Sequence, residues 1–296
     1  MNNAIIMAAG KGTRMKSDLP KVLHEILGEP MAELILNNVK KAGAERVITI
    51  VGYGHDEVEK ALQGKCEFAL QMPQLGTGHA VMQAKQLENE KGRTLVVNGD
   101  CPCVRPETYS KLFSSLDEAD MAVLTFEPED AKAYGRIIRN EQGFVEKIVE
   151  FKDCSEDEKR VREVNAGIYA FDNESLFEGL KLLKNNNAQN EYYITDLVEI
   201  LKGLGRKVTA VKVEDDQEVQ GVNDNVELAN ASAYLRKRIN TEHMKNGVTI
   251  VDPANTYIGP DVTFGHDVIV WPNSYLFGCM HVDDFTVIKP GTWKKG

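Results

Sequence analysis

Short apolar runs alternate with amphipathic stretches over the first 126 residues of the chain. The runs are rich in β-branched residues and predict strands at residues 4–8, 47–51, 68–70, 94–97 and 121–126. Apolar residues at helical spacing predict helices between them, at residues 31–42, 56–62, 80–87 and 107–116. Strands that alternate with helices form right-handed βαβ units, so we expect an α/β fold with a mostly parallel sheet and helices on both faces.

The pattern changes after residue 135. Two short β-rich runs flank residues 140–143 (Asn-Glu-Gln-Gly), whose length and composition predict a hairpin beside the sheet. Later apolar patterns predict strands at residues 163–171 and 208–213, and helices at residues 175–184 and 226–244. We place the first domain at residues 1–226 and a connecting helix at residues 227–247.

A different periodicity begins after Gly247. Period six is the sequence signature of a left-handed parallel β-helix, in which each apolar residue points into a thin prism and three hexapeptides form one coil. Six hexapeptides form about two coils, so we expect residues 248–296 to be a partial β-helix. So short a stack leaves an open end, which indicates either a longer parent chain or stabilisation by oligomerisation. The six apolar positions are Ile258, Phe264, Val270, Leu276, Val282 and Ile288.

Composition narrows the class of protein. The 296 residues are 42% hydrophobic, as in a packed globular protein, and the net charge of −10 disfavours nucleic acid as a partner. No apolar run is long enough to span a bilayer, and the start of the chain lacks the basic residues of a secretory signal, so we predict a cytoplasmic protein without a membrane partner. The five cysteines are odd in number and lack zinc-site spacing, which predicts free thiols.

Candidate chemistry begins directly after the first predicted strand. Ala8, Ala9 and Gly10 are small, and they let backbone N–H groups approach a phosphate or a base. The loop lacks the third glycine of a dinucleotide-binding fingerprint and is not a P-loop, which disfavours a dehydrogenase or a P-loop enzyme. Two cations follow it, Arg14 and Lys21, the second held by a proline that restricts the backbone.

A carboxylate follows another predicted strand. Asp100 comes after Asn98 and Gly99 at the end of strand 94–97. Ligands of open parallel sheets bind beyond the carboxyl ends of the strands, so this is a position for a ligand-binding carboxylate. The histidines His24, His55 and His79 are interpreted as structural, because an ionised phosphate nucleophile needs no general base.

Several motifs together resemble one enzyme family. Residues 7–15 read Met-Ala-Ala-Gly-Lys-Gly-Thr-Arg-Met, and residues 17–24 read Ser-Asp-Leu-Pro-Lys-Val-Leu-His. The chain closely resembles the start of the bacterial bifunctional enzyme that is both N-acetylglucosamine-1-phosphate uridylyltransferase and glucosamine-1-phosphate acetyltransferase. The match keeps the family's order up to the β-helix, and its further motifs are residues 74–80, 99–100, 134–137, 148–150, 165–168, 185–189, 191–196 and 221–223.

The resemblance implies a Rossmann-like nucleotidyltransferase that joins UTP and N-acetylglucosamine-1-phosphate. The products are pyrophosphate and UDP-N-acetylglucosamine, a precursor of cell-wall peptidoglycan. Two anions must meet in this reaction, and like unit charges about 4 Å apart repel by roughly 1 kcal/mol even in water. Arg14 and Lys21 resemble the catalytic residues that neutralise the triphosphate. Asp100 and Asn223 resemble the ligands of a Mg²⁺ ion, a hard cation that takes few protein oxygens.

Other positions resemble the substrate-binding residues of the family. Gln71, Gly76 and Thr77 correspond to the group that reads the nucleotide. A second group corresponds to the sugar pocket, namely Gly135, Glu150, Asn165, Tyr192 and Thr195. The expected substrate site is completed by Ala8, Ala9, Gly10, Lys21, Asn98, Gly99, Asp100 and Asn223.

Two alternatives remain open beside this expectation. One is another sugar-1-phosphate nucleotidyltransferase, for example one that uses dTTP and glucose-1-phosphate, and the other is a non-catalytic regulatory paralogue that binds a nucleotide sugar. The family's acetyltransferase half works on a long trimeric β-helix, which implies a homo-oligomer, a trimer where the β-helix is complete. This chain stops after about two coils, so we do not expect acetyl transfer from these residues.

Overall fold

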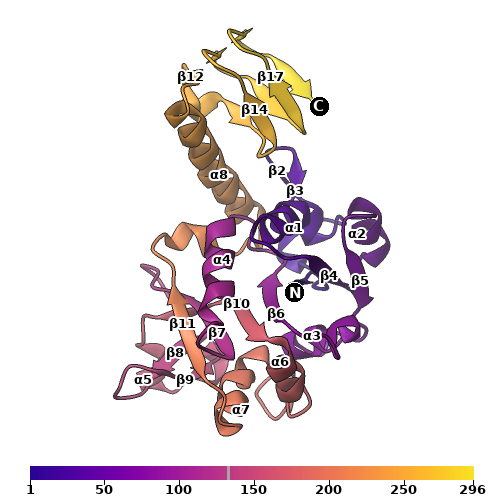
Figure 1. The fold of residues 1–296 in the computed structure, drawn as a ribbon, viewed down its shortest axis with the longest axis vertical. Helices are drawn as coiled ribbons and strands as arrows, with labels where there is room; N and C mark the ends of the chain where they lie inside the picture. The colour runs from indigo at the N-terminus through magenta and orange to yellow at the C-terminus, as the bar shows by residue number, and fades with distance from the viewer. Residues whose placement is uncertain (132–133) are drawn as a thin grey trace.

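The computed structural model describes residues 1–131 and 134–296 of the chain. In these residues, nine strands form one large sheet in the order β11, β7, β10, β6, β1, β4, β5, with β8 joined to β10 and β9 joined to β8 (Figure 1). The strands are β1 (Asn2–Met7), β4 (Arg46–Val51), β5 (Glu67–Leu70), β6 (Arg93–Asn98), β7 (Met121–Phe126), β8 (Arg136–Arg139), β9 (Val145–Val149), β10 (Val164–Asp172) and β11 (Val208–Lys212).

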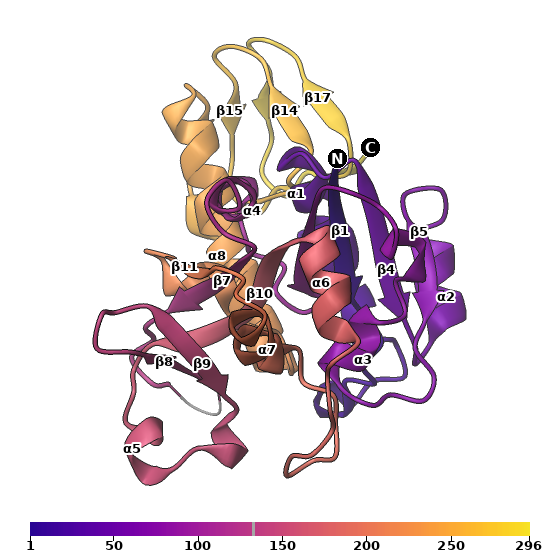
Figure 2. The same ribbon diagram turned by 60° about the horizontal axis from the view of Figure 1, so that its bottom comes forward.

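The sheet is mostly parallel, which confirms the predicted α/β class. Strand β1 pairs parallel with β4 and β6, and β7 pairs parallel with β11. Strand β10 runs antiparallel to its neighbours β6, β7 and β8, and β8 and β9 also form an antiparallel pair. The chain reaches β10 through the hairpin β8–β9 and the short helix α5 (Glu156–Lys159), set to one side of the main sheet in Figure 2, and not through a crossover helix.

Helices cover both faces of the sheet. Successive strand residues point to opposite faces, so Ala4 and Ile6 pack on one side and Ile5 on the other. Helices α1, α2 and α4 cover the first face, and α3, α6 and α7 the second. The six helices are α1 (Met31–Lys41), α2 (His55–Ala61), α3 (Thr77–Val81), α4 (Pro106–Ser115), α6 (Asn173–Leu180) and α7 (Leu197–Gly203).

Two helices are shorter than the amphipathic pattern predicts. Helix α3 ends at Val81, because Ala84 leaves the helical backbone region and residues Lys85–Leu87 form a separate 3₁₀ turn. Helix α6 ends at Leu180, where the predicted helix continued to residue 184. In both cases the apolar periodicity extends past the last helical hydrogen bond, so periodicity alone overestimates the length.

The carboxyl ends of β1 and β6 lie side by side. Met7 and Asn98 are partners in the register of the two strands. Just beyond them, the Gly99 N–H donates a hydrogen bond of 2.9 Å to the Met7 carbonyl. A Cβ at residue 99 would lie 2.7 Å from that carbonyl oxygen, so only glycine allows this approach. The loops after the two strands are thereby brought together.

The C-terminal part is a parallel β-helix, as predicted. Tyr257 pairs with Tyr275 and Val262 with Met280, in each case 18 residues along, which is three hexapeptides. Phe264 differs from the prediction, because it is only partly buried and packs edge-on against His243. The strands are β12 (Thr249–Ile250), β13 (Tyr257–Ile258), β14 (Val262–Phe264), β15 (Ile269–Val270), β16 (Tyr275–Phe277), β17 (Met280–Val282), β18 (Val287–Ile288) and β19 (Trp293–Lys295).

A long helix, α8 (Asn225–Lys245), joins the large sheet to the β-helix (Figure 1). Its residues Ala231 and Leu235 pack into an apolar cluster with the small hairpin formed by β2 (Glu25–Ile26) and β3 (Glu29–Pro30). No helix in the described part of the chain is long and apolar enough to cross a membrane.

Candidate active site

A cavity of about 330 Å³ opens where β1 and β6 end. Eight of the predicted site residues line it, namely Arg14, Thr77, Asn98, Asp100, Gly135, Glu150, Asn165 and Asn223. The other predicted residues are not among those that line the cavity: Ala8, Ala9, Gly10, Lys21, Gln71, Gly76, Gly99, Tyr192 and Thr195. Several of these contact the lining residues directly, as described below.

Lys21, Asp100 and Asn223 meet in one cluster. The Lys21 ammonium donates a hydrogen bond of 2.5 Å to Asp100 Oδ2 and another of 3.2 Å to Asn223 Oδ1. The Lys21 and Asp100 side chains are mostly buried, at 13% and 24% exposure. The two oxygens therefore converge on a single point, although Asp100 and Asn223 lie far apart in the sequence.

The local backbone holds this cluster in place. The Val222 N–H donates a hydrogen bond of 2.8 Å to the Asp100 carbonyl, which fastens the segment before Asn223 to the segment after β6. Gly12 has φ +61°, and a Cβ there would lie 2.6 Å from Lys21 Cβ. The glycine thus lets the loop after β1 pass close over the lysine stem.

Arg14 lies in the short 3₁₀ turn Thr13–Met15. Its side chain lines the cavity, while the next residue, Met15, is buried. The Met15 carbonyl accepts a hydrogen bond of 3.4 Å from Asn225 Nδ2, at the start of α8. Ala8 and Ala9 are buried and Gly10 is exposed, with no atom within 4 Å of the place where its Cβ would be. The loop therefore keeps open backbone at Gly10, and the turn that carries Arg14 is anchored through Met15.

The residues predicted to read the nucleotide lie together beyond the end of β5. Gln71 is buried and donates a hydrogen bond of 3.0 Å from Nε2 to the Gly76 carbonyl. Gly76 has φ +105°, and a Cβ there would lie 2.6 Å from the Tyr192 carbonyl oxygen. His79 Nδ1 is 3.2 Å from Gln71 Nε2, and desolvation lowers the pKa of His79. His79 therefore belongs to this packing and not to the cavity lining.

The residues predicted to bind the sugar form a polar wall of the cavity. Glu150 Oε1 accepts a hydrogen bond of 3.2 Å from the Thr195 hydroxyl. The Gly135 carbonyl accepts one of 2.9 Å from the Asn165 N–H, and Asn165 Nδ2 donates one of 2.6 Å to the Tyr169 hydroxyl. Burial raises the pKa of the Glu150 carboxyl, and the hydrogen bond from Thr195 opposes this shift. Tyr192 is linked to the nucleotide group and does not line this wall.

Glu150→Gln is expected to raise the melting temperature at pH 7. Burial raises the pKa of the Glu150 carboxyl above its ordinary value of 4.5. The protonated carboxyl therefore stabilises the fold fully below pH 4.5, and this stabilisation is lost as the pH rises through the raised pKa. Glutamine has no such loss and still accepts a hydrogen bond from Thr195. Melting curves from pH 4 to pH 8 measure the difference, with Glu146→Gln, at an exposed position of the same hairpin, as control. A lower melting temperature for Glu150→Gln at pH 7 contradicts the expectation.

Sequence reasoning missed several lining residues. Tyr134 lines the cavity, and burial raises the pKa of its phenol to about 12. Gly167 has φ +70°, and a Cβ there would lie 2.2 Å from Asn98 Nδ2, so this glycine makes room for Asn98. Glu227 also lines the cavity. A signal for it exists, since Asp224 and Glu227 have the spacing of a helix capping box.

The cysteines near the cluster are inert in character. Cys101 lines the cavity, and its thiol lies 3.6 Å from Asp100 Oδ1. Burial raises the pKa of Cys101, and it raises that of Cys103 to about 12, so both stay protonated near neutral pH. The five cysteines are free, as predicted.

The cluster around Asp100 fits a Mg²⁺ ion. Asp100 Oδ2 and Asn223 Oδ1 are hard oxygen donors that converge on one point, as their shared contact with Lys21 Nζ demonstrates. In the residues that the structure describes, no group of three or more His, Cys, Asp or Glu side chains gathers as a metal site. A site with two protein oxygens leaves positions for phosphate oxygens and waters, which is how proteins commonly hold Mg²⁺.

Comparison with known proteins gives the family. Bifunctional protein GlmU of Bacillus velezensis is 48% identical over 292 residues, covering 98% of this chain and 64% of that protein. Bifunctional protein GlmU of Latilactobacillus sakei is 50% identical over 279 residues, covering 93% and 60%, and that of Bacillus subtilis is 48% identical over 278 residues, covering 93% and 61%. The chain thus spans less than two thirds of the length of these relatives. The family model for the MobA-like NTP transferase domain matches residues 4–167, and the chain belongs to that family.

Proposed function

We propose that this chain transfers a uridylyl group from UTP to N-acetylglucosamine-1-phosphate, producing UDP-N-acetylglucosamine and pyrophosphate with the help of Mg²⁺. The observation that carries the proposal is the cluster of Lys21, Asp100 and Asn223 beside a cavity of about 330 Å³ in an NTP transferase domain. The cavity lies within the size range of small-ligand sites. The names of the relatives, and the share of this chain that they match, support the same class of activity.

The reaction is an in-line substitution at the α-phosphorus of UTP. An oxygen of the sugar phosphate forms the new bond to this phosphorus, while the bond to the oxygen that bridges to the β-phosphorus breaks and pyrophosphate leaves. The nucleophile is already ionised at neutral pH, so no side chain has to remove a proton. What the site must supply is positive charge and alignment.

Arg14 and Lys21 supply that charge from this chain. Arg14 lines the cavity from an anchored turn, and Lys21 is held by the loop that passes over its stem. A Mg²⁺ ion held by Asp100 and Asn223 would add positive charge at the phosphates of the nucleotide. Preorganised cations lower the barrier because they stabilise the charge that develops between the two phosphates.

The two substrates would occupy neighbouring places. The wall formed by Gly135, Glu150 and Asn165, with Thr195 behind it as a hydrogen-bond donor to Glu150, offers carboxylate, amide and carbonyl groups to hydroxyls and an N-acetyl group. The group around Gln71 and Gly76 is the proposed place of the base, and Gln74, in the same segment, donates a hydrogen bond to the Ala9 carbonyl in the loop after β1. Thr77 connects the two, since it lines the cavity and its hydroxyl accepts a hydrogen bond of 3.1 Å from the Ile194 N–H.

A pyrophosphate-release screen tests this function. UTP, dTTP, ATP, CTP and GTP are each paired with N-acetylglucosamine-1-phosphate, glucose-1-phosphate and glucosamine-1-phosphate, with and without excess EDTA. We expect UTP with N-acetylglucosamine-1-phosphate to have the highest kcat/KM and EDTA to abolish release. Faster release with dTTP and glucose-1-phosphate would assign the chain to another nucleotidyltransferase. Release from no pair would indicate a non-catalytic nucleotide-sugar sensor.

A further inference from the structure

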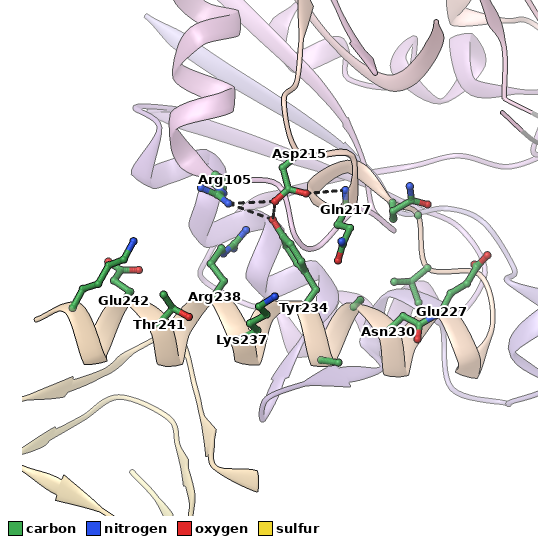
Figure 3. Close-up of a pocket in the computed structure, with 16 residues that line it drawn as sticks. Arg105, Asp215, Gln217, Glu227, Asn230, Tyr234, Lys237, Arg238, Thr241 and Glu242 are labelled. Atoms are coloured by element: carbon green, nitrogen blue, oxygen red, sulfur yellow. Dashed lines mark hydrogen bonds and ion pairs between the residues drawn. The ribbon is translucent and has the colours of Figure 1, made fainter. Parts of the chain in front are cut away.

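Glu227, in the first turn of α8, lies between two cavities. It lines the 330 Å³ cavity of the candidate active site and also a groove of about 910 Å³ that runs along α8. Figure 3 shows the groove, with Glu227 at one end of the helix and Glu242 near the other. Gly221 lines both hollows as well, so the segment from Gly221 to Asn223 is part of the wall between them.

The start of α8 does not need Glu227 as its cap. Asp224 is the N-cap residue, and its Oδ1 accepts hydrogen bonds of 2.9 Å from both the Val226 and the Glu227 N–H groups. In a capping box the third helical residue would accept from the N–H of the cap itself. Glu227 instead reaches one residue further back, and its Oε2 accepts a hydrogen bond of 2.8 Å from the Asn223 N–H.

This contact is the second of two successive backbone hydrogen bonds that hold the chain just before the Asn223 side chain. The N–H of the preceding residue, Val222, is held at 2.8 Å by the Asp100 carbonyl, and the Asn223 N–H is held by Glu227. The Asn223 side chain then projects from a clamped backbone to the point shared with Lys21 and Asp100.

We propose that Glu227 is a positioning residue that aims the Asn223 side-chain oxygen at a divalent cation shared with Asp100. The inference rests on the proposed function, in which Asn223 and Asp100 hold the metal. Groups that orient a metal ligand typically change metal affinity by about 10- to 100-fold when they are lost. Glu227 acts because its side chain is long enough to reach the Asn223 N–H. A glutamine, which has the same length, therefore preserves the effect, and the shorter aspartate does not.

The test is a titration of the full chain with Mn²⁺ in the absence of nucleotide, followed by electron paramagnetic resonance of the free ion. Glu227→Ala and Glu227→Asp are expected to raise the Kd for Mn²⁺ about tenfold. Glu227→Gln, which keeps an acceptor at the same reach, is expected to stay within about twofold of the parent chain. Glu242→Ala, the same kind of change on the same helix, is the control and leaves the Kd unchanged.

Glu227→Asp keeps the negative charge that a helix start favours, so this variant is informative even if Glu227→Ala folds poorly. A parental Kd for Glu227→Asp, or a tenfold loss in Glu227→Gln, overturns the inference. A lower melting temperature with an unchanged Kd would also overturn it, because Glu227 would then only stabilise the helix.

The parent chain separates this result from the proposed function. Pyrophosphate release without Mn²⁺ binding by the parent chain overturns the positioning role alone. If the parent chain shows neither pyrophosphate release nor Mn²⁺ binding, both the positioning role and the proposed function are overturned.

Discussion

Asp100→Asn is expected to lower the rate of uridylyl transfer at least about a hundredfold and to leave the fold intact. The change removes the negative charge of the predicted metal ligand, and a divalent cation supplies much of the charge stabilisation in this type of reaction. The fold should persist because the side chain keeps its size and the Asp100 carbonyl still accepts from the Val222 N–H. Steady-state pyrophosphate release at several Mg²⁺ concentrations measures the effect.

The control for Asp100→Asn is the same change at a carboxylate that forms an ion pair outside the candidate site. Asp117→Asn is such a change, because Asp117 forms an ion pair with Arg93 and its side chain is 66% exposed. An exposed pair contributes at most about 1 kcal/mol, so this variant should retain parental kinetics. Asp100→Asn with a normal response to Mg²⁺ would rule out Asp100 as a metal ligand, whereas loss of its melting transition would show only that the variant is unfolded.

The strands were predictable because the sheet is buried on both faces. Residues such as Ile5 and Ile48 lie on one side and Ala4 and Val47 on the other, so the apolar runs are continuous and easy to recognise. The direction of β10 was not predictable from its pattern. A buried strand has the same composition in either direction, and its direction depends on the path through β8, β9 and α5.

The candidate site was predictable only in part. The sequence places Asp100 just after a strand, and the resemblance pairs it with Asn223, which the structure brings to the same point. The role of each as a metal ligand stays a prediction. Spacing along the chain says nothing about side-chain direction, so the position of the Lys21 ammonium between the two oxygens could not be foreseen. The hydrogen bond between Glu227 and the Asn223 N–H could likewise not be predicted from the sequence.

Lys21→Ala is expected to slow transfer about a hundredfold, since loss of one preorganised donor to developing charge typically costs about 10²- to 10³-fold. The same variant should bind Mn²⁺ several-fold more tightly in the absence of nucleotide. The reason is that the Lys21 ammonium lies against both oxygens that would hold the cation, at 2.5 Å from Asp100 Oδ2 and 3.2 Å from Asn223 Oδ1. A second cation at this point is repelled, and removal of the ammonium frees both oxygens.

Opposite effects on catalysis and metal binding distinguish a charge role of Lys21 from a packing role. Lys21→Met keeps the apolar stem that passes beneath Gly12, so it should reproduce both effects of Lys21→Ala. Lys41→Ala, which breaks an exposed ion pair with Asp261, should change neither quantity. Slower transfer with weaker Mn²⁺ binding would mean that Lys21 organises Asp100 and Asn223 for the metal and does not compete with it. Parental kinetics in both Lys21 variants would exclude the lysine from the transfer step, leaving Arg14 as the predicted catalytic cation of the loop.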